Sequence, residues 1–236
     1  MFRSKALTSL LVTATILLVP GLAAAQHQSL SVNLGYFTPR SETGRVSGDV
    51  LVSDLGALYG DALMFNIKDF NNATIGAEWL VSMGTFLEVG VGAGYYASTA
   101  PSVYRDVTNS DGSEIQQDLR LRIIPVSATL RFLPTGRRAP VQPYVGIGVG
   151  VLSWRYSETG EFVDSASNIF RANYVDSGTA VGPVVVAGIR FPLGHNFAFG
   201  GELRYQKADA PLSKDFLGSR VDLGGMNYSA NFILRF

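Results

Sequence analysis

Charged side chains that could do chemistry recur at similar positions in several segments of this sequence. Glu78, Glu88 and Glu202 each stand between two apolar or small neighbours, and the arginines in matching positions are Arg131, Arg190, Arg204 and Arg235. Carboxylates and guanidinium groups form strong, charge-assisted hydrogen bonds when they meet away from water. Left unpaired, the same groups could line a path for ions. Which arrangement forms depends on the elements that position these side chains.

The sequence has few other residues suited to chemistry. It has no cysteine, which excludes disulfides, thiolate zinc sites and thiol nucleophiles. Its two histidines are His27 and His195. The polar run 109–114 resembles a calcium-binding loop, but Val107 occupies the place of the first carboxylate. We therefore expect a polar turn there, with no metal and no cofactor.

The overall composition limits the class of protein. Among 236 residues, 19 basic residues balance 19 acidic ones, and only 16% are charged while 47% are hydrophobic. A soluble domain usually has about 25% charged residues. The balanced charge gives no general field for nucleic acid. Part of the surface is therefore expected to face something other than water.

The first 25 residues have the pattern of a secretory signal peptide. Arg3 and Lys5 precede an apolar stretch over 6–22, and three alanines at 23–25 form a small-residue cleavage pattern. The remainder, 26–236, is predicted to be a single domain. No later apolar run approaches the ~18 residues that a membrane helix needs. A closed β-barrel is the other structure that can span a bilayer, because it also satisfies every backbone group internally.

The last twelve residues alternate strictly between apolar and mostly polar or small side chains. This period of two over about ten residues is typical of a transmembrane strand. The apolar set is Met226, Tyr228, Ala230, Phe232, Leu234 and Phe236. Similar alternation recurs in seven upstream segments: 29–36, 72–81, 87–95, 118–132, 143–151, 184–191 and 197–205. The sequence thus predicts an all-β fold, an eight-stranded antiparallel up-and-down transmembrane β-barrel.

The intervals between these segments alternate in length. Short intervals at 82–85, 133–142 and 192–196 are expected to be periplasmic turns, and the long ones to be extracellular loops: 39–71, 97–117, 157–177 and 207–224. Both termini would then be periplasmic. Within 118–132 the apolar parity changes after Ile123, which predicts a β-bulge near Ile124 and Pro125.

The first long interval is unusually apolar. The stretch from Val46 to Phe70 is too apolar for a loop that floats in water, and a short helix is expected near Ser53 to Gly60. Two interpretations remain open. The segment forms a hydrophobic binding surface or a lid over the barrel mouth, or it is a self-packed loop without a further role.

Aromatic residues fall at both ends of the predicted strands, always with the outward parity. Amphipathic rings favour the two membrane interfaces. The ring beside the short turns comprises Trp79, Phe132, Phe191, Phe197 and Phe236, and the opposite ring comprises Tyr36, Tyr95, Tyr205 and Tyr228. These two girdles are predicted to bound the hydrocarbon layer.

Three stretches resemble the small eight-stranded outer-membrane barrels, the group that includes the OmpA transmembrane domain, OmpX and OmpW. They are PYVGIGVGV at 143–151, EVGVGAGYY at 88–96 and the C-terminal alternation. The resemblance implies a monomer in the outer membrane of a Gram-negative bacterium, in contact with outer-membrane lipid and lipopolysaccharide. It also implies insertion by the barrel-assembly machinery, which would recognise the C-terminal signal Tyr228, Phe232, Leu234 and Phe236.

Enzymes among small barrels of this kind, the lipid A deacylases and palmitoyltransferases, need a histidine near a serine. His27 precedes the first strand and His195 lies in a predicted periplasmic turn, so neither would reach the outer rim. We therefore expect a protein that is not an enzyme.

The lumen of an eight-stranded barrel is just wide enough for side chains to fill. We expect a structural or interaction role, with the lumen closed by a polar plug: Glu78, Glu88, Glu202, Arg131, Arg190 and Arg204. The main alternative is a narrow channel or OmpW-like porin for ions or small hydrophobic molecules, with these charges as its gate. A third alternative, a secreted lipocalin-like binder, would require an apolar interior and a charged exterior.

Overall fold

A computed structural model describes residues 27–56, 62–164 and 166–236. The predicted signal peptide, 1–25, lies outside the described residues. No helix within these three ranges is long and apolar enough to cross a membrane.

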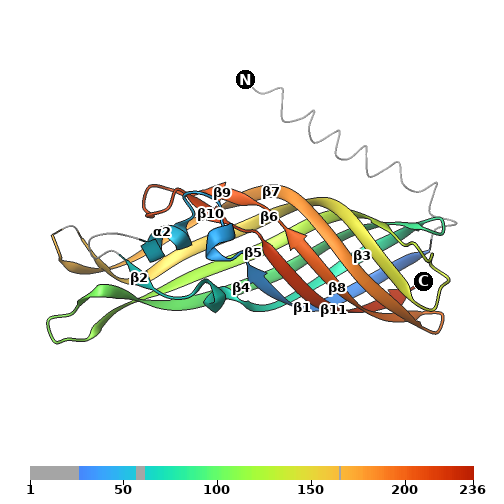
Figure 1. Cartoon of the computed structure of the whole chain (residues 1–236), viewed down its shortest axis with the longest axis horizontal. Coiled ribbons are helices and arrows are strands. Elements are labelled where there is room, and N and C mark those ends of the chain that lie inside the picture. Colours follow the sequence, from blue (N-terminus) through green and yellow to red (C-terminus); the bar gives the residue numbers. More distant parts are fainter. Residues whose placement is uncertain (1–26, 57–61, 165) are drawn as a thin grey trace, which may run out of the picture.

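Eight antiparallel strands close into a ring, which confirms the predicted fold (Figure 1). Around the ring the order is β4-β3-β1-β11-β8-β7-β6-β5, and β4 pairs with β5 to complete it. The strands are β1 (Gln28–Pro39), β3 (Asn72–Met83), β4 (Leu87–Thr108), β5 (Glu114–Phe132), β6 (Gln142–Val163), β7 (Ile169–Leu193), β8 (Phe197–Gln206) and β11 (Gly225–Arg235).

Both described chain ends lie at one end of the barrel, which we call the turn end. The backbone N–H of Gln28 donates to the carbonyl of Phe236, 3.1 Å away, so the first and last strands meet there. Tight turns join β3 to β4 and β7 to β8 at the same end. Gly84 and Gly194 occupy these turns with φ angles of 75° and 80°, a left-handed conformation that glycine adopts without strain.

The opposite end, the cap end, carries the smaller elements (Figure 1). Between β1 and β3 lie η2 (Glu42–Gly44), α2 (Val50–Gly56), β2 (Leu63–Met64) and η3 (Ile67–Phe70), and between β8 and β11 lie β9 (Asp209–Pro211) and β10 (Arg220–Asp222). The helix α2 begins earlier than predicted and is described to Gly56. Residues 57–61, which the prediction included in part, lie outside the described residues.

Two of the four predicted long loops are largely strand. The strands β4 and β5 continue to a tight turn at 109–113, and β6 and β7 continue to a turn at 164–168. The predicted loops 97–117 and 157–177 were therefore wrong, whereas 39–71 and 207–224 are long connections. These strand extensions carry polar outward residues such as Arg120 and Arg155, so they lack the apolar outer face that marks a strand inside a membrane.

The predicted bulge in β5 was also wrong. Ala93 pairs with Val126 and Tyr96 with Ile123 in one unbroken register, although pairing is interrupted between them, and β6 follows β5 without a shift. The apolar parity changes because the apolar side chains of β5 face the interior toward the cap end and face outward toward the turn end. Ile123 is only 2% exposed and faces the interior, whereas Val126 is 48% exposed and faces outward.

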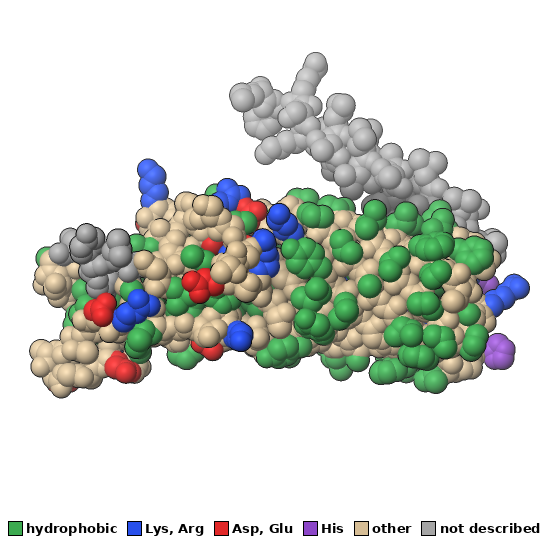
Figure 2. Space-filling view, in the orientation of Figure 1, with side chains coloured by type: hydrophobic (Ala, Val, Ile, Leu, Met, Phe, Trp, Pro, Cys, Tyr) green, Lys and Arg blue, Asp and Glu red, His purple; other side chains and the backbone are tan. Residues whose placement is uncertain are grey.

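The outer surface follows the same division. On the face drawn in Figure 2, apolar side chains gather over the half toward the turn end, while acidic and basic side chains gather toward the cap end. The barrel therefore consists of a half with an apolar exterior and a half with a polar exterior and an apolar core.

Candidate functional site: a charged plug and a cap

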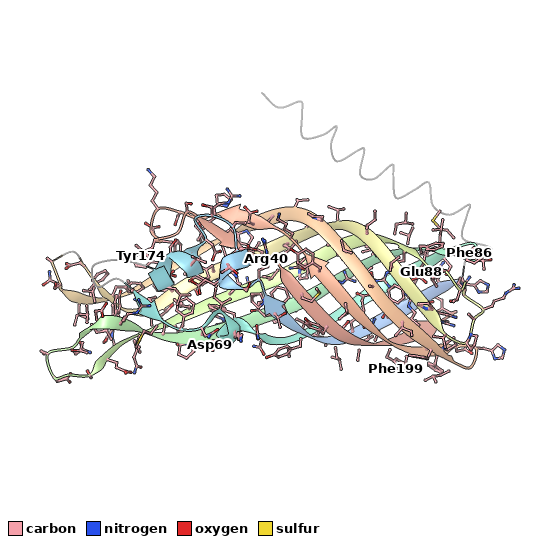
Figure 3. The ribbon with its side chains drawn as sticks, viewed as in Figure 1. Arg40, Asp69, Phe86, Glu88, Tyr174 and Phe199 are labelled. Atoms are coloured by element: carbon pink, nitrogen blue, oxygen red, sulfur yellow. The ribbon has the colours of Figure 1, made fainter. Side chains whose placement is uncertain are left out.

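A buried charge cluster, which we call the plug, fills the barrel toward the turn end. The structure brings together all six charged residues predicted for it. They come from five strands and comprise Glu78 (β3), Glu88 (β4), Arg131 (β5), Arg190 (β7), and Glu202 and Arg204 (β8). Each points inward because its neighbours along the strand face outward. Figure 3 shows Glu88 inside the barrel near the turn end.

Arg131 lies at the centre of the plug. Its Nη2 atom is 2.5 Å from Glu78 Oε2 and 2.9 Å from Glu202 Oε2, and its Nη1 atom is 4.0 Å from Glu88 Oε1. One guanidinium group thus faces all three carboxylates.

Arg190 binds Glu88 through both guanidinium Nη atoms. The Nη1–Oε2 and Nη2–Oε1 distances are 2.9 and 2.7 Å, which is the fork-to-fork geometry of a strong charged pair. The Tyr144 ring lies against both cations, with its centroid 4.4 Å from the Arg190 guanidinium carbon and 5.0 Å from that of Arg131. Its hydroxyl donates to Glu202 Oε2 at 2.8 Å.

Arg204 completes the plug on the side toward the cap. Its Nε donates to Glu202 Oε1 at 3.0 Å, and its Nη1 donates to Ser127 Oγ at 2.7 Å. Three carboxylates therefore meet three guanidinium groups, and the formal charges cancel. Buried charges are tolerated when they are paired in this way. Arg235, the fourth inward arginine, instead donates to Gln142 Oε1 at 2.8 Å.

The sequence analysis missed Tyr144, although it shares the inward parity of Gly146 and Gly148. Glycines on the inner wall make room for the plug, because a Cβ on Gly188 would collide with the Tyr144 hydroxyl and one on Gly90 would come within 2.6 Å of Glu78 Oε1. Inward glycines therefore mark occupied space in this part of the lumen.

The second closure is the cap, formed by residues 40–56 and 62–71 between β1 and β3 and by 207–224 between β8 and β11. A buried network ties its two segments together. Arg45 binds Asp49 through Nε and Nη2, at 2.5 and 3.0 Å, and Nη2 also donates to the Asp222 carbonyl at 2.9 Å. The Asp222 carboxylate accepts from Arg40 Nη1 and from the Val46 N–H, each at 3.0 Å. Figure 3 shows Arg40 close to the cap.

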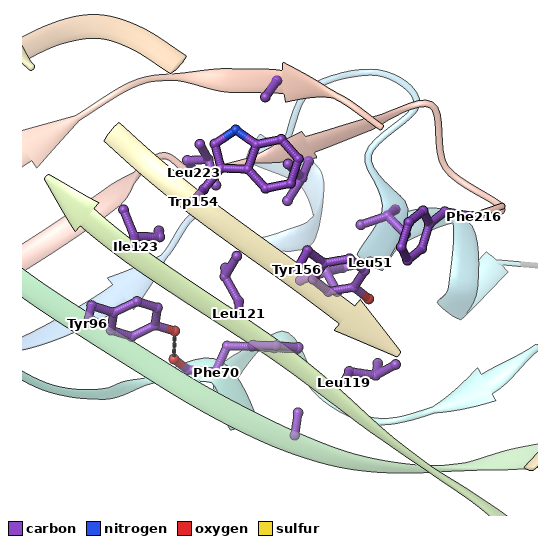
Figure 4. Packing of buried hydrophobic residues seen from close by; sticks show 14 of the residues in the cluster. Leu51, Phe70, Tyr96, Leu119, Leu121, Ile123, Trp154, Tyr156, Phe216 and Leu223 are labelled. Atoms are coloured by element: carbon purple, nitrogen blue, oxygen red, sulfur yellow. Dashed lines mark hydrogen bonds between the residues drawn. The ribbon is translucent and has the colours of Figure 1, made fainter. Parts of the chain in front are cut away.

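The apolar side chains of the cap pack into the barrel mouth (Figure 4). Leu51 and Phe70 are fully buried, and Phe216 lies 5.5 Å from Tyr156 between ring centroids. The Tyr96 hydroxyl donates to the Phe70 carbonyl and fixes η3 to β4. Burying each large apolar side chain stabilises the cap by about 1.5 to 3 kcal/mol. Of the interpretations offered for the apolar first loop, the lid over the mouth matches the described part of this segment.

Two acidic residues lie within the cap core without a counter-charge. Asp54 of α2 and Glu158 of β6 are buried, and Asp54 Oδ2 and Glu158 Oε1 have no hydrogen-bond partner among the described residues. Burial raises the pKa of Asp54 well above its usual value, and the nearby Glu158 and Asp49 raise it further. Burial raises the pKa of Glu158 from 4.5 to about 7. The cap core thus favours protonated carboxyl groups.

A cavity of about 70 Å³ separates the plug from the cap core. Such a volume holds a few water molecules. Its lining includes Glu78, Ser127 and Arg204 from the plug side and Tyr96 and Leu152 from the cap side. It also reaches Gly94 and Pro125, where the β4–β5 pairing is interrupted.

The family model of the outer membrane protein beta-barrel domain matches residues 9–236. The chain belongs to this outer-membrane β-barrel family. No curated protein matches its sequence.

Two solved structures of outer-membrane proteins share the fold of this barrel. It is similar to the outer membrane protein OprG from Pseudomonas aeruginosa, with 13% identity, coverage of 90% of this chain and 96% of that one, and a TM-score of 0.53. It is also similar to a major outer membrane protein from Thermus thermophilus, with 12% identity, coverage of 90% and 100%, and a TM-score of 0.50. The predicted resemblance to small outer-membrane barrels is confirmed, and at these identities the likeness concerns the fold alone.

The predicted aromatic girdle residues lie mostly on the outer surface of the barrel. Outward aromatic rings of such barrels meet the membrane interfaces. The structure turns eight of the nine predicted girdle residues outward as exposed side chains, and Tyr205 is half-buried. Trp79 packs edge-on against Phe236 with centroids 5.4 Å apart, so the first ring includes the chain end. The four residues of the predicted assembly signal also face outward.

The histidines of the barrel lie away from the cap and the plug. His27 and His195 are exposed at the turn end.

Within the described ranges, no group of three or more histidine, aspartate or glutamate residues could hold a metal ion. The polar run at 109–114 is a turn in which Asp111 accepts from the N–H and hydroxyl of Ser113.

Proposed function

We propose that this outer-membrane barrel has a structural or interaction role and acts neither as an enzyme nor as an open pore. The observation that carries the proposal is the double closure of its interior. The plug fills the lumen toward the turn end with neutralised charges, and the cap fills the opposite mouth with apolar side chains. A barrel closed in this way offers its outer surface and its cap to other molecules.

In this proposal the turn end faces the periplasm and the cap faces the outside. Short turns on the periplasmic side and longer connections on the outside are the rule for outer-membrane barrels. The protein is a monomer surrounded by outer-membrane lipid and lipopolysaccharide, and the barrel-assembly machinery inserts it. Nucleic acid is not a partner.

Recording across planar bilayers tests the closed state. The purified barrel should give no current steps, because charged pairs occupy the lumen at the plug and apolar side chains occupy the mouth at the cap. The matched control is the empty detergent used for reconstitution. Regular current steps from the wild-type barrel would overturn the proposal.

A second candidate function is a narrow passage that the plug gates. The cavity between plug and cap favours it, because it extends to the interrupted pairing at Gly94 and Pro125 and so approaches the outer wall. Glu88→Ala should then produce current steps by releasing Arg190, whereas Glu161→Ala at the far tip should not. A silent Glu88→Ala barrel that is correctly folded would exclude this gate.

A further inference from the structure

Three arginines form an outward cluster on the polar half of the barrel, which we call the arginine cluster: Arg120 and Arg122 on β5 and Arg155 on β6. Arg122 and Arg155 are direct cross-strand partners in an antiparallel pair. In the part of the chain that the structure describes, no carboxylate lies within 4.0 Å of any of the three side chains, and none of them makes a hydrogen bond.

This arrangement is unfavourable without an external anion. Side chains of direct cross-strand partners have Cβ atoms about 4.5 to 5.5 Å apart, and like charges at that spacing repel. The acidic residue next along the outer face of β5, Asp118, lies farther toward the tip and makes no ion pair with Arg120. The plug shows that this chain neutralises arginines where it buries them. The arginine cluster has no such neutralising carboxylate among the described residues.

The neighbours of the arginine cluster suit an oxyanion. Arg155 has serines two residues before and after it, Ser153 and Ser157, and faces Ser177 on β7. Hydroxyl groups donate hydrogen bonds to phosphate oxygens, and guanidinium groups bind phosphate with two parallel N–H donors.

The height of the arginine cluster identifies the source of the phosphate. The outward apolar residues end at Ile124 on β5 and at Val151 on β6. At about 3.3 Å per residue and a tilt of about 40°, Arg122 and Arg155 lie about 5 and 10 Å beyond those side chains. The headgroup layer of a bilayer extends about 5 to 8 Å beyond the hydrocarbon on each side. Arg122 therefore lies at headgroup height, and the long side chains of Arg120 and Arg155, which start farther out, can reach back toward the same layer.

We propose that Arg120, Arg122 and Arg155 form a docking surface for the phosphate groups of outer-leaflet lipopolysaccharide. Acyl chains of the same glycolipid lie against the exposed apolar wall directly below, at Val151 and its cross-strand partner Val181. The docking surface rests on the proposed orientation, with the cap outside, and adds to it a specific lipid contact.

Lipid titration of the purified barrel tests this surface. The protein is folded in zwitterionic detergent, and bisphosphorylated lipid A is added while native mass spectrometry counts bound lipid. Arg122→Ser/Arg155→Ser should weaken binding at least tenfold. The matched control, Arg105→Ser/Arg171→Ser, removes two exposed arginines nearer the strand tips and should change binding less than twofold. Removing the phosphates from lipid A should weaken its binding to the wild-type barrel to a similar extent.

Thermal unfolding distinguishes lipid docking from a structural role of the arginines. In zwitterionic detergent, Arg155→Ser should leave the Tm unchanged or raise it, because it relieves the repulsion from Arg122. In mixed micelles with lipid A the same variant should lower the Tm relative to the wild type. If Arg155 had a role in folding alone, the change in Tm caused by Arg155→Ser would have the same sign with and without lipid A.

Three results would overturn the proposal. The double variant could bind lipid A as tightly as the wild type. Alternatively, it could lose binding to heparin, a soluble sulfated polymer, while keeping lipid A, which would make the surface a polyanion site. Finally, Asp111→Cys at the cap-end turn, in a chain without native cysteine, could resist membrane-impermeant thiol labelling on whole cells. That result would refute the orientation, whereas binding in micelles tests the arginine cluster independently of it.

Discussion

The buried pair of Glu88 and Arg190 should show strong energetic coupling. Both side chains are buried, and their carboxylate and guanidinium groups meet through two hydrogen bonds of 2.7 and 2.9 Å. Removing one partner of such a pair typically costs about 3 to 5 kcal/mol, because the other charge stays buried without compensation. In Glu88→Ala the Arg190 guanidinium would keep only the Tyr144 ring and the net charge of the plug would become +1.

The double variant Glu88→Ala/Arg190→Ala removes both charges at once. Its free energy of unfolding should therefore be higher than the sum of the single effects predicts, by at least about 2 kcal/mol. Arg190→Ala alone should be the milder single change, because Glu88 would still have Arg131 at 4.0 Å.

Reversible urea unfolding in lipid vesicles, followed by tryptophan fluorescence, measures all four proteins of this cycle. The pair Glu161 and Arg171 provides the matched control, since it has a similar separation of 3.2 Å but an Arg171 side chain that is 85% exposed. Its coupling should not exceed about 0.5 kcal/mol. Equal coupling in the two cycles, or none for Glu88 and Arg190, would refute the reasoning about the plug.

Three further outcomes are expected from other parts of the molecule. Val149→Arg, on the exposed apolar wall, should lower the free energy of unfolding by about 2 to 4 kcal/mol in lipid, whereas Thr179→Arg on the polar half should change it little. Deleting Phe236 should prevent insertion more than it destabilises the folded barrel, because one terminal ring contributes only about 1.5 to 3 kcal/mol; normal outer-membrane levels of the deletion variant on immunoblots would contradict this. Because the pKa of Glu158 rises from 4.5 to about 7 on folding, the folded cap binds more protons between these values, and its stability should fall by about 3 kcal/mol as pH rises through that window. Hydrogen exchange of α2 should detect the loss, and Glu158→Gln should remove the part that Glu158 contributes, leaving the part due to Asp54, whose pKa burial also raises.

The barrel itself was determined by the sequence. Period-two alternation places apolar side chains on one face of a strand. When eight segments share this pattern, a barrel wall between lipid and a polar lumen is the arrangement that gives every apolar face an apolar environment. The same parity predicted which charged residues point inward, so Glu88 and Arg190 could be expected to share the lumen although they are 102 residues apart.

The tertiary structure decided how far the strands extend and which face is apolar at each height. In the sequence, the apolar parity of Leu119 and Ile123 suggests a change of register in β5. Alternation alone does not show whether the apolar side chains of a strand face the lumen or the outside. Only the cap, assembled from segments far apart in the chain, makes the inner side apolar there. Likewise, parity alone could not select which arginine pairs with which glutamate, because strand stagger around the ring sets those distances. The arginine cluster could not be predicted from the sequence either, because only the strand register shows that Arg122 and Arg155 are direct cross-strand neighbours.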